Sequence, residues 1–310
     1  MPVIGSAEDR ERARAFAGVE LGGTKCICTL AAGPGDIRDQ RTIATTVPSE
    51  TLPAIHAALE EWSAGPGFGG LGVAAFGPLQ IDPRARGYGR VGATNKADWE
   101  GADLLGPMRA FGVPIGFDTD VNGAALAEIR WGSGRGLDDF AYVTVGTGVG
   151  VGLIVHGRPT RGLGHSEIGH IRVPRLSGDD AASVCRFHDD CVEGLASGTA
   201  VKARIGARQW SDVVADDPVW EPVVHSLAVM LHALAVTAGP MRVAMGGGVL
   251  AGQPHLLPRI NSALRASLAG YMPLPSDGDY VVAPALGPLA GPLGAIALAM
   301  DATEAATGAG

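Results

Sequence analysis

The sequence predicts an α/β protein built as two lobes, and three observations lead to this. The chain has 310 residues, 46% of them hydrophobic, which is more typical of two domains or lobes than of one. Short apolar runs typical of strands alternate with segments of helical pattern. A strand, a glycine turn and a second strand occur twice, at 16–33 and 140–157. We therefore expect an internally duplicated architecture with one such hairpin in each lobe.

Charge and hydropathy argue against two classes of partner. The net charge is −8 and the basic residues are scattered, so no nucleic-acid-binding surface is expected. The amino-terminal stretch carries charges where a signal peptide needs an apolar run. The longest apolar stretch, 227–238, is interrupted by His232 and is too short to span a bilayer. We expect a cytoplasmic protein that binds neither nucleic acid nor membranes.

The first hairpin contains a glycine turn that resembles a phosphate-binding loop only in part. Gly18 and Gly23 have the spacing of a P-loop, but the order Thr24-Lys25 reverses the required Lys-Ser/Thr and no helical pattern follows. A Walker site is therefore not expected. Glycine turns nevertheless let backbone N–H groups approach phosphate oxygens, and threonine adds a hydroxyl.

If the turns of the two hairpins face each other, we expect them to bind a polyphosphate between them. A single glycine-rich hairpin, by contrast, is more often only a turn. The second turn is carried by the hairpin at 140–157. The hairpin residues predicted to bind the nucleotide are Glu20, Gly22, Gly23, Thr24, Lys25, Gly146, Thr147 and Gly148. Cys26 and Cys28 lie at i and i+2 of the apolar run, so we expect them on one face of a strand as small core residues.

Between the hairpins, residues 51–63 have a helical pattern and residues 71–79 form a predicted buried strand ending at Gly77-Pro78. A long glycine-rich loop follows. Such a loop either binds a ligand or is a plain surface excursion. If it binds, Asn95 and Lys96 are its candidate ligand contacts.

The next strand is predicted over 113–117 and the next helix over 122–131. Asp118, Thr119 and Asp120 lie between them, at the carboxyl end of the strand, where open α/β sheets bind their ligands. An aspartate at this place either acts as a general base or caps the helix.

From residue 223 onward, helices and strands alternate again. We predict helices over 223–238, 261–268 and 293–300 and strands over 241–250 and 280–283. The strand at 241–250 runs into Gly246, Gly247 and Gly248, which allow a flat base or ribose to lie close to the backbone. The last segment, 301–310, is expected to be disordered.

The segment between the second hairpin and residue 200 contains four potential metal ligands. Cys185, His188 and Cys191 have C-x2-H-x2-C spacing, and His170 lies fifteen positions upstream of Cys185. Thiolate and imidazole are the ligands that zinc prefers, and a complete set of four is typical of a structural site. The alternative is that these are ordinary core cysteines and a surface histidine. A bound ion would also immobilise the neighbouring Glu167 and Glu193.

These motifs resemble those of the ROK family of sugar kinases, and most closely its bacterial fructokinase branch. The similarity extends over nearly the whole chain, from Gly18 to Ala299. The matching signatures are ExGGTK at 20–25, DTDVNGAA at 118–125, GTGxG at 146–150, ExGH at 167–170 and the zinc motif CxxHxxCxEGLxSG at 185–198.

The resemblance implies an actin-like ATPase (ribonuclease H-like) fold of two α/β lobes, with ATP and a hexose meeting in a central cleft. We expect a small lobe over 14–117, completed by a helix near 290–301, and a large lobe over 118–289. Asp120 matches the general base of the family, and Glu167, His170 and Glu193 match its sugar contacts. His170 would then serve sugar and zinc with one ring nitrogen each. The full predicted substrate-binding set is Gly77, Asn95, Lys96, Thr119, Asp120, Glu167, His170 and Glu193.

The expected reaction is transfer of the γ-phosphoryl group of ATP to the 6-hydroxyl of a hexose, with fructose preferred. Asp120 would accept the hydroxyl proton, Glu20 would orient Mg²⁺ through water, and a structural Zn²⁺ would hold the sugar-binding loop. A homodimer is expected. Two alternatives remain: a mannokinase or glucokinase of broader specificity, and a non-catalytic sugar-sensing regulator of the same family. Such regulators need a helix-turn-helix, for which the about seventeen residues before the first strand are too few.

Overall fold

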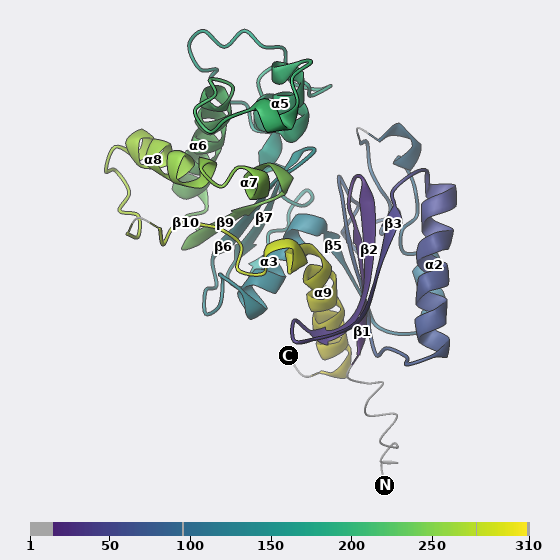
Figure 1. Cartoon of the computed structure of the whole chain (residues 1–310). Helices are drawn as coiled ribbons and strands as arrows, with labels where there is room; N and C mark the ends of the chain where they lie inside the picture. Colours follow the sequence, from purple (N-terminus) through teal and green to yellow (C-terminus); the bar gives the residue numbers. More distant parts are fainter. Residues whose placement is uncertain (1–14, 95, 277, 309–310) are drawn as a thin grey trace. The chain divides into compact units, whose positions relative to one another are not determined.

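The computed structural model describes residues 15–94, 96–276 and 278–308, and their helices and strands fall into two units (Figure 1). Unit 1 contains the described residues up to Trp131, the short segment Arg161–His165, and the described residues from Pro288 onward. Unit 2 contains Gly132–Thr160 and Ser166–Gly287. Within the described residues, each unit has one five-stranded sheet.

The sheet of unit 1 has the strand order β3-β2-β1-β4-β5. Its strands are β1 (Phe16–Leu21), β2 (Lys25–Gly33), β3 (Asp36–Ala44), β4 (Leu71–Ala75) and β5 (Ile115–Thr119). Strands β1, β2 and β3 pair antiparallel, whereas β4 runs parallel to β1 and β5 parallel to β4. The predicted first hairpin is therefore present, and Cys26 and Cys28 are buried in its second strand as expected.

The sheet of unit 2 repeats this arrangement strand for strand, in the order β8-β7-β6-β9-β10. Its strands are β6 (Phe140–Val145), β7 (Val149–Val155), β8 (Arg158–Pro159), β9 (Arg242–Gly246) and β10 (Val281–Val282). Again the first three strands pair antiparallel, and the last two join in parallel. The α/β class and the duplication expected from the two hairpins are confirmed.

Helices cover both faces of the sheet in unit 1. They are α2 (Pro48–Ala64), α3 (Asp120–Trp131) and α9 (Ala290–Thr307), with 3-10 turns at Ala97–Trp99 and Pro107–Phe111. Helices α2 and α9 lie on opposite faces of the sheet (Figure 1). On one face, Ile55, Leu59 and Trp62 of α2 join the apolar core of the strands. On the other face, α9 buries Ala295 and Leu298 against Ala74 of β4.

Helix α9 packs on the sheet at backbone distance because glycines face it. A Cβ atom on Gly72 of β4 would overlap the carbonyl oxygen of Ala295, and one on Gly116 of β5 would overlap that of Leu298. Such close packing places many pairs of atoms at their optimal separation. One face of the sheet of unit 1 is therefore covered by a helix from the carboxyl end of the sequence.

The prediction of disorder over 301–310 is wrong for the residues up to Thr307, because α9 continues to that position. Arg130 of α3 donates to Asp301 Oδ1 at 2.6 Å and to Glu304 Oε1 at 3.3 Å. These tertiary ion pairs order a segment whose composition alone suggests a free tail.

Unit 2 is organised around a long core helix, α6. Its helices are α4 (Val192–Ala196), α5 (Gly198–Ile205), α6 (Trp220–Thr237), α7 (Gly248–Gly252) and α8 (Leu256–Leu268). Among the described residues, α6 is the one helix long and apolar enough to suit a membrane span, with a mean hydropathy of 1.2 over 18 residues. However, 61% of that stretch is buried inside the structure, where α6 packs against α4 and α8. This is the burial expected of the core helix of a globular domain.

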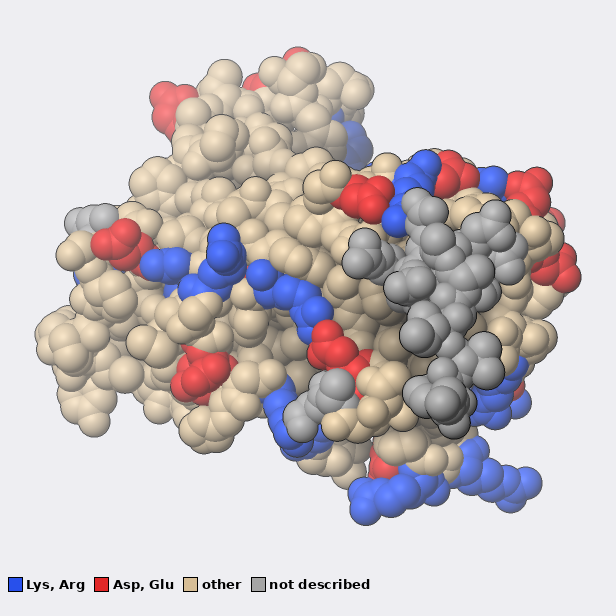
Figure 2. Space-filling view, turned by 90° about the horizontal axis from the view of Figure 1, so that it is seen from below, with Lys and Arg blue, Asp and Glu red and all other residues tan. Residues whose placement is uncertain are grey.

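Basic and acidic side chains are interspersed on the face of the molecule that Figure 2 shows. Several basic residues there stand beside acidic ones, and uncharged residues cover most of the view. On the described residues of this face, the charges are therefore mixed in sign.

The glycine contact between α9 and β4 leads to a stability prediction. Gly72→Ala should lower the free energy of unfolding by about 3 kcal/mol or more, because the new methyl group meets a backbone carbonyl that cannot rotate away. Urea unfolding followed by circular dichroism measures this. Gly35→Ala, in the turn between β2 and β3, is the control, since an added Cβ there has nothing within 4 Å. Equal unfolding midpoints for the two variants would show that the close contact is relaxed in solution.

Candidate active site

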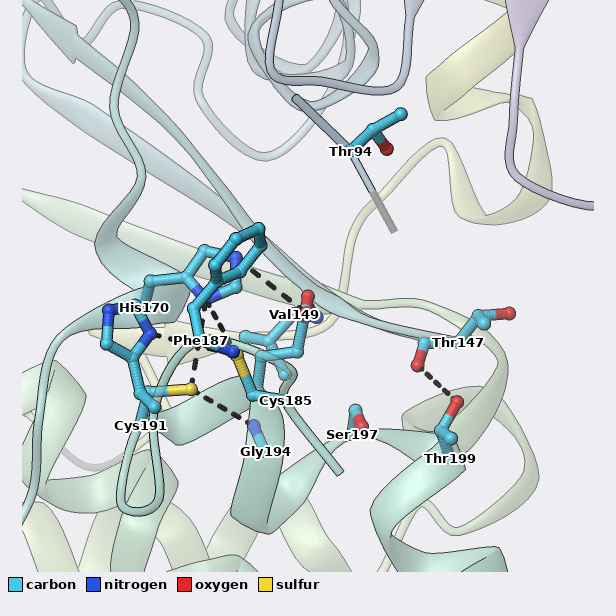
Figure 3. Close-up of polar contacts among 12 residues, drawn as sticks. Thr94, Thr147, Val149, His170, Cys185, Phe187, Cys191, Gly194, Ser197 and Thr199 are labelled. Atoms are coloured by element: carbon cyan, nitrogen blue, oxygen red, sulfur yellow. Dashed lines mark hydrogen bonds and ion pairs between the residues drawn. The ribbon is translucent and has the colours of Figure 1, made fainter. Parts of the chain in front are cut away.

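Four metal-ligand side chains meet in unit 2. The ligand atoms of His170, Cys185, His188 and Cys191 all lie within 4.8 Å of one another. His170 Nδ1 is 3.7 Å from both Cys185 Sγ and Cys191 Sγ (Figure 3). His188 Nδ1 is also 3.7 Å from Cys185 Sγ. Tetrahedral zinc with Zn–S of about 2.3 Å and Zn–N of about 2.0 Å places its S and N ligands roughly 3.5 Å apart. The donor set and its spacing therefore fit one tetrahedral ion.

Local backbone structure positions these ligands. His170 ends a 3-10 turn at Ile168–His170, and Cys191 is the N-cap of α4. Each sulfur accepts a backbone N–H at 3.4 Å: Cys185 Sγ from Phe187 and Cys191 Sγ from Gly194 (Figure 3). Burial raises the pKa of the Cys191 thiol to about 11, against the opposing hydrogen bond from Gly194. Deprotonation of this thiol at neutral pH therefore needs a nearby positive charge such as a metal ion.

Glu193 connects this cluster to the turn of the second hairpin. Its Oε1 lies 3.7 Å from His170 Nε2, and its Oε2 accepts the N–H of Val149 at 3.1 Å. A Cβ on Gly148 would overlap the Glu193 carboxylate, so a larger residue there would displace this side chain. Glu193 thus lies between the imidazole and the turn between β6 and β7. His170 presents its two nitrogens to different groups, Nδ1 to the sulfurs and Nε2 toward the carboxylate.

The turn between β6 and β7 also docks on the start of α5. Gly198 N donates to Gly146 O at 2.7 Å, and Thr199 Oγ1 donates to Thr147 O at 2.8 Å (Figure 3). Gly247 follows the neighbouring parallel strand β9 with φ of 91°, and a Cβ there would meet the backbone of Val145. Two glycine segments, Gly146–Gly148 and Gly246–Gly248, therefore lie at the carboxyl ends of adjacent strands, as ligand sites of α/β sheets do.

The first glycine turn, in unit 1, is held by threonine. Gly22 N donates to Lys25 O at 3.1 Å, and Thr45 Oγ1 donates to Gly22 O at 2.9 Å. Thr45 N also donates to Thr24 O at 3.0 Å. A Cβ on Gly23 would meet the side chain of Lys96 at 3.6 Å, so Lys96 lies beside this turn as well as over the ring of Phe76.

Glu20 and Asp120 form a pair of carboxylates in unit 1. Burial, followed by the charge of Asp120, raises the pKa of Glu20 from 4.5 to about 7, while Lys25 opposes the shift. A Cβ on Gly291, near the start of α9, would overlap the Glu20 carboxylate. Asp120 is the first residue of α3, and its Oδ1 accepts the N–H of Val121 at 2.9 Å. The repulsion between two neighbouring carboxylates favours a cation near them.

The structure shows the hydrogen-bond partners of Asp118 and Thr119, which the sequence alone did not predict. Thr119 Oγ1 accepts the N–H of Asn122 at 3.2 Å, so a threonine fills the N-cap position where an aspartate was considered. Asp118 is completely buried and accepts hydrogen bonds from Thr119 N at 2.7 Å, Asn122 Nδ2 at 2.8 Å and Arg161 at 2.8 Å. A carboxylate so engaged is poorly suited to proton transfer, which leaves Asp120 as the candidate base.

The remaining predicted residues divide between the units. Gly77 follows β4 in unit 1, and Glu167 precedes His170 in unit 2 with its side chain exposed. Asn95 lies outside the described residues. Sequence reasoning missed Arg161, which pairs with Asp118, and Thr199, which binds the second turn. No spacing rule marks either residue, because each acts on a partner more than forty residues away.

Comparison with known proteins gives consistent matches. The family model of the ROK family matches residues 16–302. A fructokinase from Pediococcus pentosaceus is 37% identical, covering 92% of this chain and 98% of the relative. A putative fructokinase from Bacillus subtilis is 36% identical, covering 94% and 98%.

Among solved structures, a ROK family glucokinase from Streptomyces griseus in complex with glucose and AMPPNP superposes with a TM-score of 0.76. It is 28% identical and covers 93% of this chain and 99% of its own. The ROK hexokinase from Thermus thermophilus gives a TM-score of 0.75 at 24% identity, covering 94% and 99%. The actin-like ATPase fold expected from the sequence is confirmed.

The four-ligand cluster leads to a metal prediction. The protein purified without chelators should carry about one tetrahedrally bound metal ion per chain, because four donors have the spacing that one ion requires. Cys185→Ser should lower the metal content and the melting temperature, since the site loses a thiolate. Inductively coupled plasma mass spectrometry and thermal unfolding measure these. Cys28→Ala, a buried cysteine outside the cluster, is the control that should keep its metal. A protein without stoichiometric metal would mean that the cluster is a set of core side chains.

Proposed function

This chain belongs to the ROK family, and we propose that it transfers the γ-phosphoryl group of ATP to the 6-hydroxyl of a hexose, with fructose preferred. The observation that carries the proposal is identity of 36–37% to fructokinases over more than nine-tenths of the chain. The Streptomyces griseus structure, a glucokinase with glucose and AMPPNP, supports the use of ATP and a hexose. Positioning and charge neutralisation dominate phosphoryl transfer, and the chain offers groups suited to both.

Asp120 is the proposed general base. It lies at the first turn of α3, directly after the carboxyl end of β5. As the bond between the sugar oxygen and phosphorus forms, the Asp120 carboxylate would accept the hydroxyl proton. Thr119 beside it retains a hydroxyl proton that it can donate, because its oxygen accepts from Asn122 N.

The proposed nucleotide contacts are the two glycine turns, through backbone N–H groups other than those of Gly22 and Gly146, which bond within their own turns. The hydroxyls of Thr24 and Thr147 and the glycines at 246–248 complete the set. Backbone N–H groups cradle phosphate oxygens without a side chain in the way. Magnesium, when bound with ATP, would supply positive charge to the transferring phosphoryl group. Glu20 and Asp120 together offer the negative charge that favours a cation in unit 1.

Zinc is the proposed occupant of the four-ligand cluster, because two thiols and two imidazoles are its preferred donors. The site would serve as a structural anchor, since all four positions are protein ligands. His170 and Glu193 would be held in place by it and contact the sugar together with Glu167. The proposal includes a cytoplasmic homodimer that binds neither nucleic acid nor membranes. The scattered charge of the sequence supports the part of the proposal that concerns nucleic acid.

Replacing the base tests the mechanism. Asp120→Asn should lower kcat by roughly 10²- to 10⁴-fold while sugar binding persists, because the amide keeps the shape but accepts no proton. A coupled ADP-release assay and sugar titration followed by calorimetry measure the two effects. Asp36→Asn, an exposed aspartate in β3 paired with Arg38, is the matched control. Turnover near the wild-type rate in Asp120→Asn would show that another group takes the proton.

The preferred sugar is tested by comparing kcat/KM for fructose, mannose and glucose at saturating Mg-ATP. We expect kcat/KM for fructose to exceed that for glucose by about tenfold to more than a hundredfold. The single hydroxyl of Thr119 leaves one polar group of a bound pyranose without a hydrogen-bond partner. Thr119→Asn should raise the relative rate on glucose, since asparagine offers a donor and an acceptor and remains a good N-cap. Glucose equal to or better than fructose in the wild type would overturn the preference, and no ADP release with any hexose would overturn the kinase assignment.

A further inference from the structure

The short segment Arg161–His165 belongs to unit 1, although the residues on both sides of it in the sequence belong to unit 2. Arg161 and His165 attach it to the rest of unit 1. Arg161 donates to Asp118 Oδ2 at 2.8 Å and to Asp118 Oδ1 at 3.4 Å. The backbone N–H of Leu79 donates to His165 Nε2 at 2.9 Å. The chain therefore enters unit 1 at this point to bring a guanidinium to a buried carboxylate.

The Asp118 side chain is 0% exposed, whereas that of Arg161 is 48% exposed. A buried ionised carboxylate is costly unless hydrogen bonds and an opposite charge compensate it. Thr119 N and Asn122 Nδ2 supply hydrogen bonds, and Arg161 supplies the positive charge in a two-point contact. Among the described residues, the guanidinium is the hydrogen-bond partner of this carboxylate that comes from outside the corner between β5 and α3.

The same carboxylate fixes the geometry of that corner. Its Oδ1 binds both Thr119, the last residue of β5, and Asn122, in the first turn of α3. Asp120 lies between these two anchor points. Any relaxation of Asp118 toward water would therefore move the backbone that carries the proposed base.

We infer that Arg161 is a positioning residue for phosphoryl transfer: by compensating the buried Asp118, it holds the corner between β5 and α3 in the geometry that presents Asp120 to the sugar hydroxyl. This rests on the proposed function. The role is distinct from substrate contact, since Arg161 acts through Asp118. A displacement of the reacting group by about 1 Å costs on the order of 10²-fold in rate, so a modest relaxation of the corner suffices for a large effect.

The exposure of Arg161 offers a direct test by chemical rescue. Arg161 lines a pocket of about 390 Å³ in unit 1, together with residues 80–85 and 162–164. In Arg161→Ala, the space left by the removed side chain would open from this pocket toward Asp118, so guanidinium ion from solution is the natural probe of rescue.

We expect Arg161→Ala to lower kcat roughly 10- to 100-fold with little change in KM for ATP, because the nucleotide contacts are elsewhere. Millimolar guanidinium chloride should restore kcat saturably, and sodium chloride at equal ionic strength should not. Arg161→Lys should retain an intermediate kcat, since it keeps the charge and loses the two-point contact. Arg84→Ala is the matched control: this arginine lines the same pocket but pairs with the exposed Asp82.

Stability gives a readout independent of activity. Arg161→Ala should lower the melting temperature by roughly 5 °C or more, because it leaves a buried charge unpaired. In the double variant Asp118→Asn, Arg161→Ala, part of this loss should return, since a neutral amide needs no counterion. If Arg161→Ala folds too poorly to assay, the melting temperature and kcat of the double variant and of Arg161→Lys carry the test.

The outcomes separate the two levels of the proposal. A wild-type kcat in Arg161→Ala would overturn the positioning role while the kinase function stands. A loss of activity that neither guanidinium nor lysine relieves would also overturn it, because the charge would not be what matters. A wild-type protein without activity on any hexose would overturn the proposed function itself, and the melting temperatures would still report on the ion pair.

Discussion

The His170 imidazole lies between the two cysteine sulfurs of the metal-ligand cluster and the Glu193 carboxylate, which binds the turn between β6 and β7. Nδ1 faces the sulfurs of Cys185 and Cys191, and Nε2 faces Glu193, which in turn binds the backbone N–H of Val149. His170 is one of the residues that would hold an ion in this cluster, and such an ion would fix the orientation of its ring. The positions of the Glu193 carboxylate and of the turn between β6 and β7 therefore depend on the orientation of the His170 ring.

The two units use one sheet topology for different purposes. Both have three antiparallel strands followed by two parallel ones, and both place a glycine turn between the first two strands. In unit 1, the carboxyl end of the fifth strand, β5, carries Asp118 to Asp120 and hence the proposed chemistry. In unit 2, the fifth strand, β10, has only two residues, and the insertion after β8 carries the metal ligands instead. The two units therefore share one sheet topology, and different segments of that topology carry the proposed functional residues of each unit.

Much of the fold and part of the site follow from local sequence patterns. Glycine hairpins, buried strands and the C-x2-H-x2-C spacing are local signals, and the structure confirms the strands and gathers the four ligands. The pairing of Arg161 with Asp118 and the order of residues 301–307 were not predictable in this way. Both depend on ion pairs between residues that are distant in sequence. The local sequence around an arginine or a polar tail is the same whether or not such an ion pair forms. The sequence motif was enough to select Asp120 as a candidate base. The burial of the nearby Asp118 became known only from the structure.

The close fit of α9 against glycines of β4 and β5 has a consequence for biosynthesis. The strands of unit 1 have all been made by residue 119, but the helix that covers one face of their sheet starts at residue 290. Contacts between such distant segments form late, because a ribosome extends the chain from its amino end. Unit 2 is complete at residue 287, so it can fold first on the emerging chain. Until α9 has been made, the face of the unit 1 sheet that this helix covers stays exposed. A chaperone that shields this face would be needed most by the amino-terminal part of the molecule, even though that part is made first.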